Sequence, residues 1–200
     1  MIPHKELAIL CKQSYLYESY TIRECELLLM KRAGVQVVII RGTEGRSADD
    51  LLRKKGWLDV WRDAKLFPWY DKNFGWGHYG FIKGGISIAS FLSNKLDRRM
   101  PIVLTGHSMG AALSLVVMAD LIAKGFNIKE RVGFAEPKSQ LSKRTWAVKQ
   151  TIYRHRADIV PLMPRWSPYR HNIKITQLLD DTGLRPTWSD HPIELYIKSL

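Results

Sequence analysis

The sequence predicts an α/β fold in which a mixed, mostly parallel central sheet is flanked by helices. Short apolar runs alternate with segments whose apolar residues recur at helical spacing. Two strand-like segments flank Arg32-Ala33-Gly34, a hairpin signal, so the sheet is expected to be mixed rather than wholly parallel. Residues 101–118 combine a strand, a tight glycine turn and a helix. Together these three observations favour an α/β layer architecture.

The chain is long enough for one domain with a substantial core. Its 200 residues are 46% hydrophobic, and a domain of this size buries roughly 70% of its unfolded surface. No repeat, low-complexity tract or linker divides the sequence, so we expect a single domain over residues 1–200. The expected elements, in order, are a helix over 6–17, hairpin strands over 26–31 and 35–41, a helix over 81–96 with a weak point at Gly84-Gly85, a strand over 101–105, a helix over 109–124, strands over 131–135, 151–156 and 172–177, and a helix over 193–197.

The turn Gly106-His107-Ser108-Met109-Gly110 is the most informative motif of the chain. It has the pattern G-x-S-x-G, which lifts a serine onto a sharp strand-to-helix turn, with glycines where a Cβ would collide. The same turn places the serine beside the N–H groups at the start of a helix. A glycine-rich turn can also be a plain connector, but the strand and helix around it favour a nucleophile at Ser108.

A serine nucleophile needs a base and an acid, and candidates follow in the order that such hydrolases use. Asp158 stands at the end of the strand over 151–156 and precedes Ile159-Val160-Pro161. His191 lies in a loop before the last helix. The other acids are less suitable, because Asp180-Asp181 resemble a solvated turn and Asp190 adjoins the histidine itself. We therefore expect Ser108, Asp158 and His191 to form a triad.

These pieces resemble the class 3 lipases, a family that includes triacylglycerol lipases, mono- and diacylglycerol lipases, some phospholipases A1 and some feruloyl esterases. The resemblance spans most of the chain and implies an α/β-hydrolase fold and hydrolysis of lipid esters. Five segments carry it in the family's order, namely Val38–Thr43 ending in Arg-Gly-Thr, Gly77–Phe81, the serine turn, Asp158–Pro161 and His191.

The resemblance also implies an oxyanion hole. Thr43 follows the Arg-Gly pair, and its N–H, together with that of Met109, would stabilise a tetrahedral intermediate; Arg41-Gly42-Thr43 could otherwise simply end a strand. The resemblance makes His78 structural. For His107 we expect a packing role and for His155 a hydrogen-bonded or surface role, while no motif supports a role for His4 or His171.

The segment after Thr43 bears on the substrate. In the family it often forms a lid, and residues 44–61 contain the basic run Arg53-Lys54-Lys55 with Trp57 and Trp61. Such a lid could lie on a lipid interface and meet anionic headgroups. The alternative, which we favour for most aromatic residues of 57–81, is that they fill the core beneath the sheet.

The net charge of +12 attracts anionic partners without fixing their nature. A basic nucleic-acid-binding or anionic-surface-binding protein on a degenerate hydrolase scaffold is therefore the alternative function. The sequence has no nucleic-acid-binding motif, and its basic residues are dispersed, so nucleic acid is not the expected partner. We expect a lipid ester hydrolase, or an esterase for small soluble esters, that needs no metal or other cofactor.

The termini and the two cysteines bear on the compartment. The first residues, Met1 to Glu6, lack the pattern of a signal peptide, and no stretch is apolar enough to span a membrane. We therefore expect a cytoplasmic protein, one exported without a leader, or a mature form. Cys11 and Cys25 are expected to be thiols, although a single bridge between them is open at this point.

Overall fold

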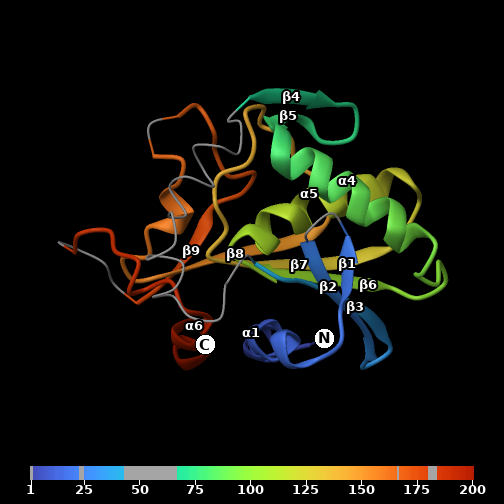
Figure 1. The fold of residues 1–200 in the computed structure, drawn as a ribbon, viewed down its shortest axis with the longest axis horizontal. Helices are drawn as coiled ribbons and strands as arrows, with labels where there is room; N and C mark the ends of the chain where they lie inside the picture. Colours follow the sequence, from blue (N-terminus) through green and yellow to red (C-terminus); the bar gives the residue numbers. More distant parts are fainter. Residues whose placement is uncertain (1, 23–24, 43–66, 166, 180–183) are drawn as a thin grey trace.

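The computed structural model describes residues 2–22, 25–42, 67–165, 167–179 and 184–200 (Figure 1). A seven-stranded sheet with the order β1-β2-β3-β6-β7-β8-β9 runs through the molecule. The first three strands pair antiparallel, and β3, β6, β7, β8 and β9 pair parallel. The predicted mixed, mostly parallel sheet is thus confirmed. The strands are β1 (Tyr20–Ile22), β2 (Cys25–Arg32), β3 (Val35–Ile40), β6 (Ile102–His107), β7 (Ile128–Phe134), β8 (Lys149–His155) and β9 (Ile175–Leu178).

Helices cover both faces of this sheet. Figure 1 shows α1 (His4–Gln13) and α6 (Ile193–Ser199) together on one face, and α4 (Tyr79–Ser93) and α5 (Met109–Ala123) on the other. The short 3-10 helix η1 (Ser14–Leu16) continues α1, and a second one, η2 (Val160–Leu162), follows β8. A separate two-stranded hairpin, β4 (Pro68–Asp71) and β5 (Gly75–His78), leads directly into α4.

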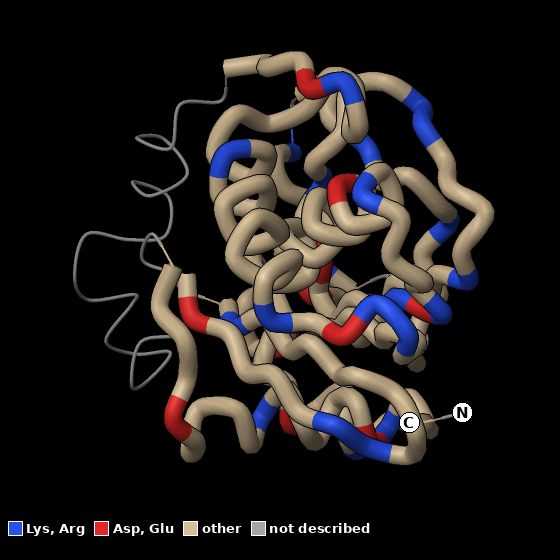
Figure 2. The backbone as a smooth tube through the Cα atoms, turned by 90° about the vertical axis from the view of Figure 1, so that its right-hand side faces the viewer, with Lys and Arg blue, Asp and Glu red and all other residues tan. Residues whose placement is uncertain are grey.

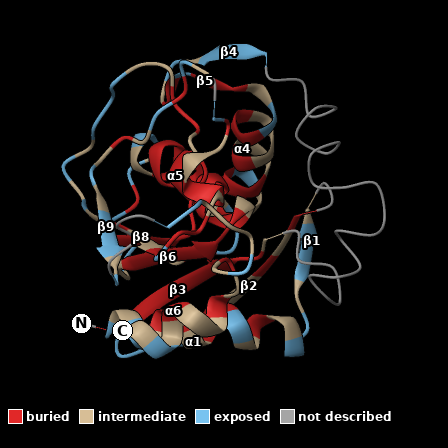
Figure 3. Ribbon diagram, turned by 90° about the vertical axis from the view of Figure 1, so that its left-hand side faces the viewer, coloured by how far each residue is buried: buried red, intermediate tan, exposed pale blue. Residues whose placement is uncertain are grey.

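The core has one cluster on each side of the sheet. Every residue of β3 and β6 is buried, because helices cover both faces of these central strands (Figure 3). One cluster packs α4 and α5 against the sheet, and the other packs α1 and α6 against the opposite face. The elbow between β6 and α5 is therefore held between two packed layers.

Several boundaries agree with the sequence analysis. The β2–β3 hairpin turns at Ala33 and Gly34, whose φ values of 49° and 74° match the two positive-φ positions of a type I′ turn. Gly125, with φ 78°, follows the end of α5 at the position where helices favour glycine. Both cysteines lie in described residues and are buried thiols with no disulfide between them.

Other expectations were wrong. Gly84-Gly85 does not weaken α4; a Cβ at Gly85 would overlap Val116, so the glycine lets α4 pack closely on α5. The last strand covers Ile175–Leu178 rather than 172–177, and β7 begins at Ile128 rather than 131. Strand β1 and the β4–β5 hairpin were not predicted, because short strands have little periodicity and depend on their pairing partners.

The expectation that most aromatic residues of 57–81 fill the core was also wrong for the hairpin. Phe74 and Phe81 are buried, but Phe67, Trp69, Tyr70 and Trp76 are exposed. Trp57, Trp61 and the basic run at 53–55 lie outside the described residues.

The surface is basic over a wide area. Figure 2 shows Lys and Arg positions on many elements of the described chain rather than on one alone. Within the described ranges, no helix combines the length and the apolar character needed to cross a membrane.

Candidate active site

Ser108 occupies a strained turn between β6 and α5. Strand β6 ends at His107 and α5 begins at Met109, so Ser108 alone makes the turn, with φ 57° and ψ −129°. Positive φ is uncommon for residues other than glycine and costs about 1–3 kcal/mol. The Ser108 N–H donates to the Phe134 carbonyl oxygen at 2.9 Å, which holds the turn against β7.

Glycines make room for this turn. A Cβ on Gly106 would stand 2.5 Å from the Gly110 carbonyl carbon, and a Cβ on Gly110 would overlap the Ile40 carbonyl oxygen. At Gly42, just after β3, a Cβ would stand 2.9 Å from the His107 carbonyl oxygen and 3.2 Å from the Ser108 Cβ. The ends of β3 and β6 can therefore meet at the serine only when these positions lack a side chain.

The structure brings Ser108, His191 and Asp158 together in a hydrogen-bonded chain. The Ser108 Oγ lies 3.1 Å from His191 Nε2, and His191 Nδ1 lies 3.0 Å from Asp158 Oδ2. All three residues are buried. Because a carboxylate only accepts hydrogen bonds, Nδ1 carries the proton, and the Nε2 lone pair faces the serine hydroxyl. This geometry can transfer the serine proton to an imidazole whose tautomer is fixed by the acid.

Asp158 is kept ionised by its hydrogen bonds. Burial by itself would raise the pKa of Asp158, but the hydrogen bond and charge of His191 oppose it and lower this pKa overall. The Tyr196 hydroxyl adds a 2.6 Å hydrogen bond to Oδ2, and the Val160 N–H donates to Oδ1 at 2.9 Å. Burial and the neighbouring carboxylate raise the pKa of Tyr196, which therefore remains a donor.

The loop that carries His191 is fixed at two points. His107 Nε2 donates to the His191 carbonyl oxygen at 3.0 Å, and the two imidazole rings lie 4.7 Å apart. Asp190 Oδ2 accepts from the Ala157 N–H at 3.1 Å, so it joins this loop to the loop of Asp158. The contact of Asp190 is thus with a backbone N–H, and His107 does more than pack.

The family model described as lipase (class 3) matches residues 37–167, which include the serine turn and Asp158. The chain belongs to the class 3 lipase family. Among curated relatives, the chain is 26% identical over 169 residues to phospholipase A1-II 1 of Oryza sativa subsp. indica. The match covers 76% of this chain and 40% of the rice protein, so the chain spans less than half the length of that relative.

Solved structures show the same fold. The Lip2 lipase of Yarrowia lipolytica superposes with a TM-score of 0.61 at 20% identity, covering 88% of this chain and 77% of the yeast chain. The triacylglyceride lipase of Rhizomucor miehei superposes with a TM-score of 0.56 at 16% identity, covering 74% of this chain and 60% of the fungal chain. The predicted α/β-hydrolase fold is confirmed.

The first part of the family's Arg-Gly-Thr segment is anchored firmly in this chain. The buried Arg41 guanidinium binds the Glu26 carboxylate and the Ser14 carbonyl, and it donates to the Tyr17 carbonyl at 2.7 Å. Arg41 therefore fixes the chain just before Gly42. Thr43 lies outside the described residues, as does the segment 44–61 for which a lid is considered.

The remaining histidines have structural contacts. The ring of His78 is buried 4.6 Å from that of Phe81. His155 is buried beside Tyr196, its ring 5.7 Å from the phenol, so the surface alternative for it was wrong. His171 Nε2 donates to the Pro161 carbonyl at 2.8 Å, and His4 lies 2.9 Å from Glu130 and 2.8 Å from the Tyr153 hydroxyl.

Sequence reasoning missed Tyr196 and the positioning role of His107. Tyr196 contacts Asp158 across 38 positions of the chain, so the contact could not be seen before folding. One signal was available, since Tyr196 is a polar aromatic residue in the apolar helix that directly follows His191.

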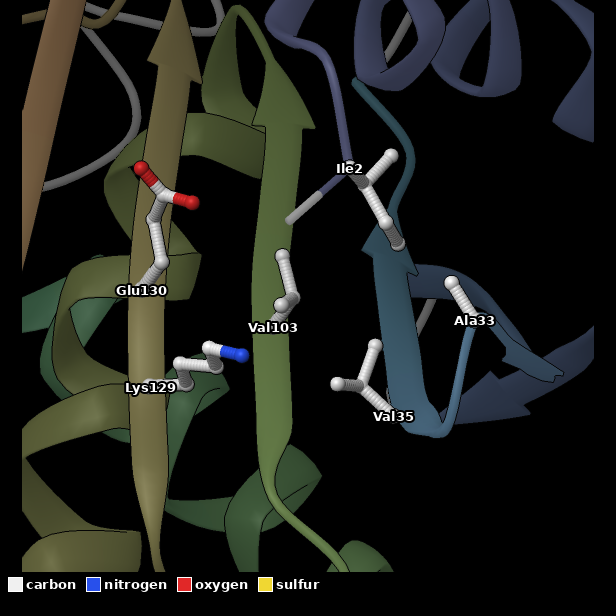
Figure 4. A pocket seen from close by; sticks show the side chains of 6 residues that line it. All are labelled: Ile2, Ala33, Val35, Val103, Lys129 and Glu130. Atoms are coloured by element: carbon white, nitrogen blue, oxygen red, sulfur yellow. The ribbon is translucent and has the colours of Figure 1, made fainter.

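A separate depression lies at the amino edge of the parallel strands (Figure 4). Val103 lies near the start of β6, five residues before Ser108 at the other end of that strand, a spacing of about 16 Å. The depression is therefore no part of the serine site. Its lining residues are Ile2, Ala33, Val35, Val103, Lys129 and Glu130.

In the part of the chain that the structure describes, no group of three or more His, Cys, Asp or Glu side chains could hold a metal ion. The expectation that no cofactor is needed stays a prediction.

Proposed function

We propose that this chain hydrolyses carboxylic esters of lipids through an acyl-enzyme on Ser108. The observation that carries the proposal is the relay of Ser108, His191 and Asp158 on a strained strand-to-helix turn. Membership of the class 3 lipase family supports lipid esters as the substrate. The similarity to a protein named phospholipase A1 makes a phospholipid one candidate substrate.

The first half-reaction forms the acyl-enzyme. His191 Nε2 accepts the proton of the Ser108 hydroxyl as the oxygen attacks the ester carbonyl carbon, and a tetrahedral oxyanion forms. Asp158 holds the imidazole and stabilises its positive charge. When the intermediate collapses, the alcohol leaves and takes the proton from His191 Nε2. Water then attacks the acyl-enzyme by the same sequence and releases the fatty acid.

The oxyanion needs hydrogen-bond donors on one side of Ser108. Met109 is the first residue of α5, and N–H groups in the first turn of a helix have no partner within the helix. We assign the second donor to Thr43, because Gly42, its neighbour in the chain, lies against Ser108. Two such donors fit this chemistry, since losing one costs a comparable hydrolase about 3 kcal/mol of transition-state stabilisation.

The direct test is turnover of p-nitrophenyl esters by wild type and Ser108→Ala. We expect the variant to lose about a thousandfold or more in kcat, because no other nucleophile replaces the serine. An organophosphonate probe should label the wild type and not Ser108→Ala. Ser87→Ala is the matched control, because this α4 serine hydroxyl donates to the Lys83 carbonyl in its own helix. Unchanged turnover in Ser108→Ala would refute the proposal.

The substrate class is tested by a series of acyl-chain lengths, each measured below and above the concentration at which the ester aggregates. A lipid hydrolase should prefer long chains and gain rate on aggregation. Preference for short chains without such a gain would instead indicate an esterase for small soluble esters. Binding of nucleic acid that survives Ser108→Ala, without any turnover, would favour the basic binding protein.

A further inference from the structure

The β4–β5 hairpin presents aromatic side chains that the fold itself does not bury. Phe67, Trp69, Tyr70 and Trp76 are each between 44% and 63% exposed. Tyr70 and Trp76 are cross-strand partners, and their rings lie 5.5 Å apart on one face of the hairpin. Single exposed apolar residues are ordinary, but two exposed aromatic rings packed against each other indicate an interaction surface.

The hairpin that carries these exposed side chains is firmly attached to the rest of the fold. Phe74 is fully buried beneath it and stacks on Trp146 at 6.1 Å. Asp71 Oδ1 accepts the N–H groups of Asn73 and Phe74, both at 2.9 Å, and thereby closes the turn. A further hydrogen bond joins Asn73 to Asp120 on α5 at 3.0 Å.

Neighbouring chain fixes the second strand as well. The Trp76 N–H donates to Ser142 Oγ at 3.1 Å, and the Leu141 N–H donates to the Trp76 carbonyl at 2.9 Å. With its backbone tied on this side, Trp76 keeps its ring facing outward. The Tyr70 and Trp76 rings thus form a preformed aromatic surface on the hairpin, which we call the platform.

The charge around the platform is positive. Residues 67–83 and 138–146 contain one acidic residue, Asp71, against five basic ones. Lys83 places its ammonium 4.7 Å over the Trp69 ring, and Arg144 donates to the Lys72 carbonyl at 2.7 Å. Figure 2 shows basic positions on this side of the molecule. With five basic residues against one acidic residue, the platform offers mainly positive charge to a partner.

The platform lies over the start of α4, as Figure 1 shows. Helix α4 runs back to the amino end of β6, so its own start lies toward the carboxyl edge of the sheet, where Ser108 stands. The platform therefore lies toward the same edge of the sheet as Ser108.

We propose that the β4–β5 platform docks the protein on a lipid surface that carries anionic headgroups. Tryptophan and tyrosine rings prefer the level of the headgroups, and nearby lysine and arginine residues gain from negative surface charge. A second copy of the chain is a poorer occupant, because both copies carry a net charge of +12. The inference rests on the proposed lipid-ester function, and it adds a docking surface made of residues outside the segment 44–61.

Co-sedimentation with vesicles tests the docking surface. The assay uses Ser108→Ala as the background, so that lipid is not consumed, and compares phosphatidylcholine vesicles with and without phosphatidylglycerol. We expect binding that increases with phosphatidylglycerol and weakens with salt. Tyr70→Ala with Trp76→Ala should lower the partition coefficient roughly tenfold or more, because two rings at the headgroup level are lost. Lys72→Gln and Lys143→Gln should each lower it about fivefold at low salt.

Lys129→Gln is the matched charge control, because Lys129 is exposed on β7 at the opposite edge of the sheet. The same substitutions, made with Ser108 intact, should leave hydrolysis of a short soluble ester unchanged, which also shows that they fold. Wild-type vesicle binding by the Tyr70/Trp76 variant would overturn the inference, as would an equal effect of Lys129→Gln. The inference would also be overturned if the Tyr70/Trp76 variant lost self-association while its vesicle binding stayed at the wild-type level.

The two proposals fail in different ways. Soluble-ester turnover with vesicle binding that ignores the hairpin would end the docking proposal and leave the hydrolase. Hairpin-dependent vesicle binding without any ester turnover would end the hydrolase and leave the surface.

Discussion

At Ser108 the backbone has a conformation that suits glycine better than serine, and its neighbours hold it there. The strain places the Oγ opposite His191 at the entrance to α5. The geometry of this site therefore lowers the local stability of the fold, as is common at functional sites.

This strain makes a prediction that separates function from stability. Ser108→Gly should be more stable than Ser108→Ala by about 1 kcal/mol, because glycine relieves the positive φ and alanine does not. Urea unfolding of the two variants at neutral pH measures the difference. Both should be inactive, so activity cannot explain it. Equal midpoints would show that the turn is not strained.

Tyr196 is the residue whose role the sequence did not reveal. In Tyr196→Phe the Asp158 carboxylate loses a donor, so we expect kcat to fall roughly tenfold with little change in KM. Tyr153→Phe is the matched control, because its hydroxyl bonds His4 on α1 at 2.8 Å. Steady-state kinetics on a soluble ester distinguish the two variants. An equal loss in both would mean that the effect is one of general stability.

At the level of single residues, the sequence indicated Ser108, Asp158 and His191 because their order and local context are those of a known chemistry. Their supports could not be found in the same way. The partners of Asp158 and the acceptor of His107 come from segments that meet only after folding.

At the level of elements, long apolar segments were predictable and short pairings were not. Strands β3 and β6 and helix α5 are mostly apolar segments, and the structure has them within one or two residues of the expected bounds. The β4–β5 hairpin consists of four-residue strands rich in aromatic residues and glycine, whose pattern fits a core segment equally well.

The packing around α5 predicts that alanine substitutions at two glycines differ sharply in their cost to stability. Gly110→Ala should destabilise the fold by about 3 kcal/mol or more and abolish turnover, because its methyl group meets the carbonyl oxygens of Ile40 and Arg41. Gly84→Ala should be milder, since its nearest neighbour is the end of the Leu113 side chain at 2.9 Å. Thermal unfolding compares the two variants. A mild Gly110→Ala would mean that the elbow tolerates wider spacing.

On the scale of the whole molecule, a buried ion pair joins the sheet to the nucleophile helix. Arg131 on β7 pairs with Glu136, donates to the Ala111 carbonyl at 2.9 Å, and reaches Ser114 at 3.0 Å. Both charged residues are fully buried. Burial raises the pKa of Glu136 although Arg131 opposes this. Removing one partner alone would leave an uncompensated charge beneath the first turns of α5.

Acid stability should depend on His171, which links the chain before β9 to the loop after Asp158. Burial lowers the pKa of His171 to about 4, against an ordinary value of 6.5. Between these values the unfolded chain binds a proton that the folded chain does not, so stability falls as the pH falls from 6.5 towards 4. The loss approaches about 3 kcal/mol.

Urea unfolding at pH 7 and at pH 4.5 checks this expectation. His171→Gln keeps a donor for the Pro161 carbonyl but cannot titrate, so it should lose less stability than wild type between the two pH values. The burial that lowers the pKa of His155 adds to the fall in both proteins and does not affect the comparison. An identical fall in wild type and variant would contradict the prediction.

The two buried thiols have a consequence for the integrity of the molecule. Burial raises the pKa of Cys11 to about 12, so that it stays protonated and unreactive, and Cys25 is also buried. Since no covalent cross-link ties the two, noncovalent packing alone holds their segments together. Transfer between oxidising and reducing surroundings therefore leaves the fold unchanged. The stability of the fold depends instead on solvent, temperature and pH.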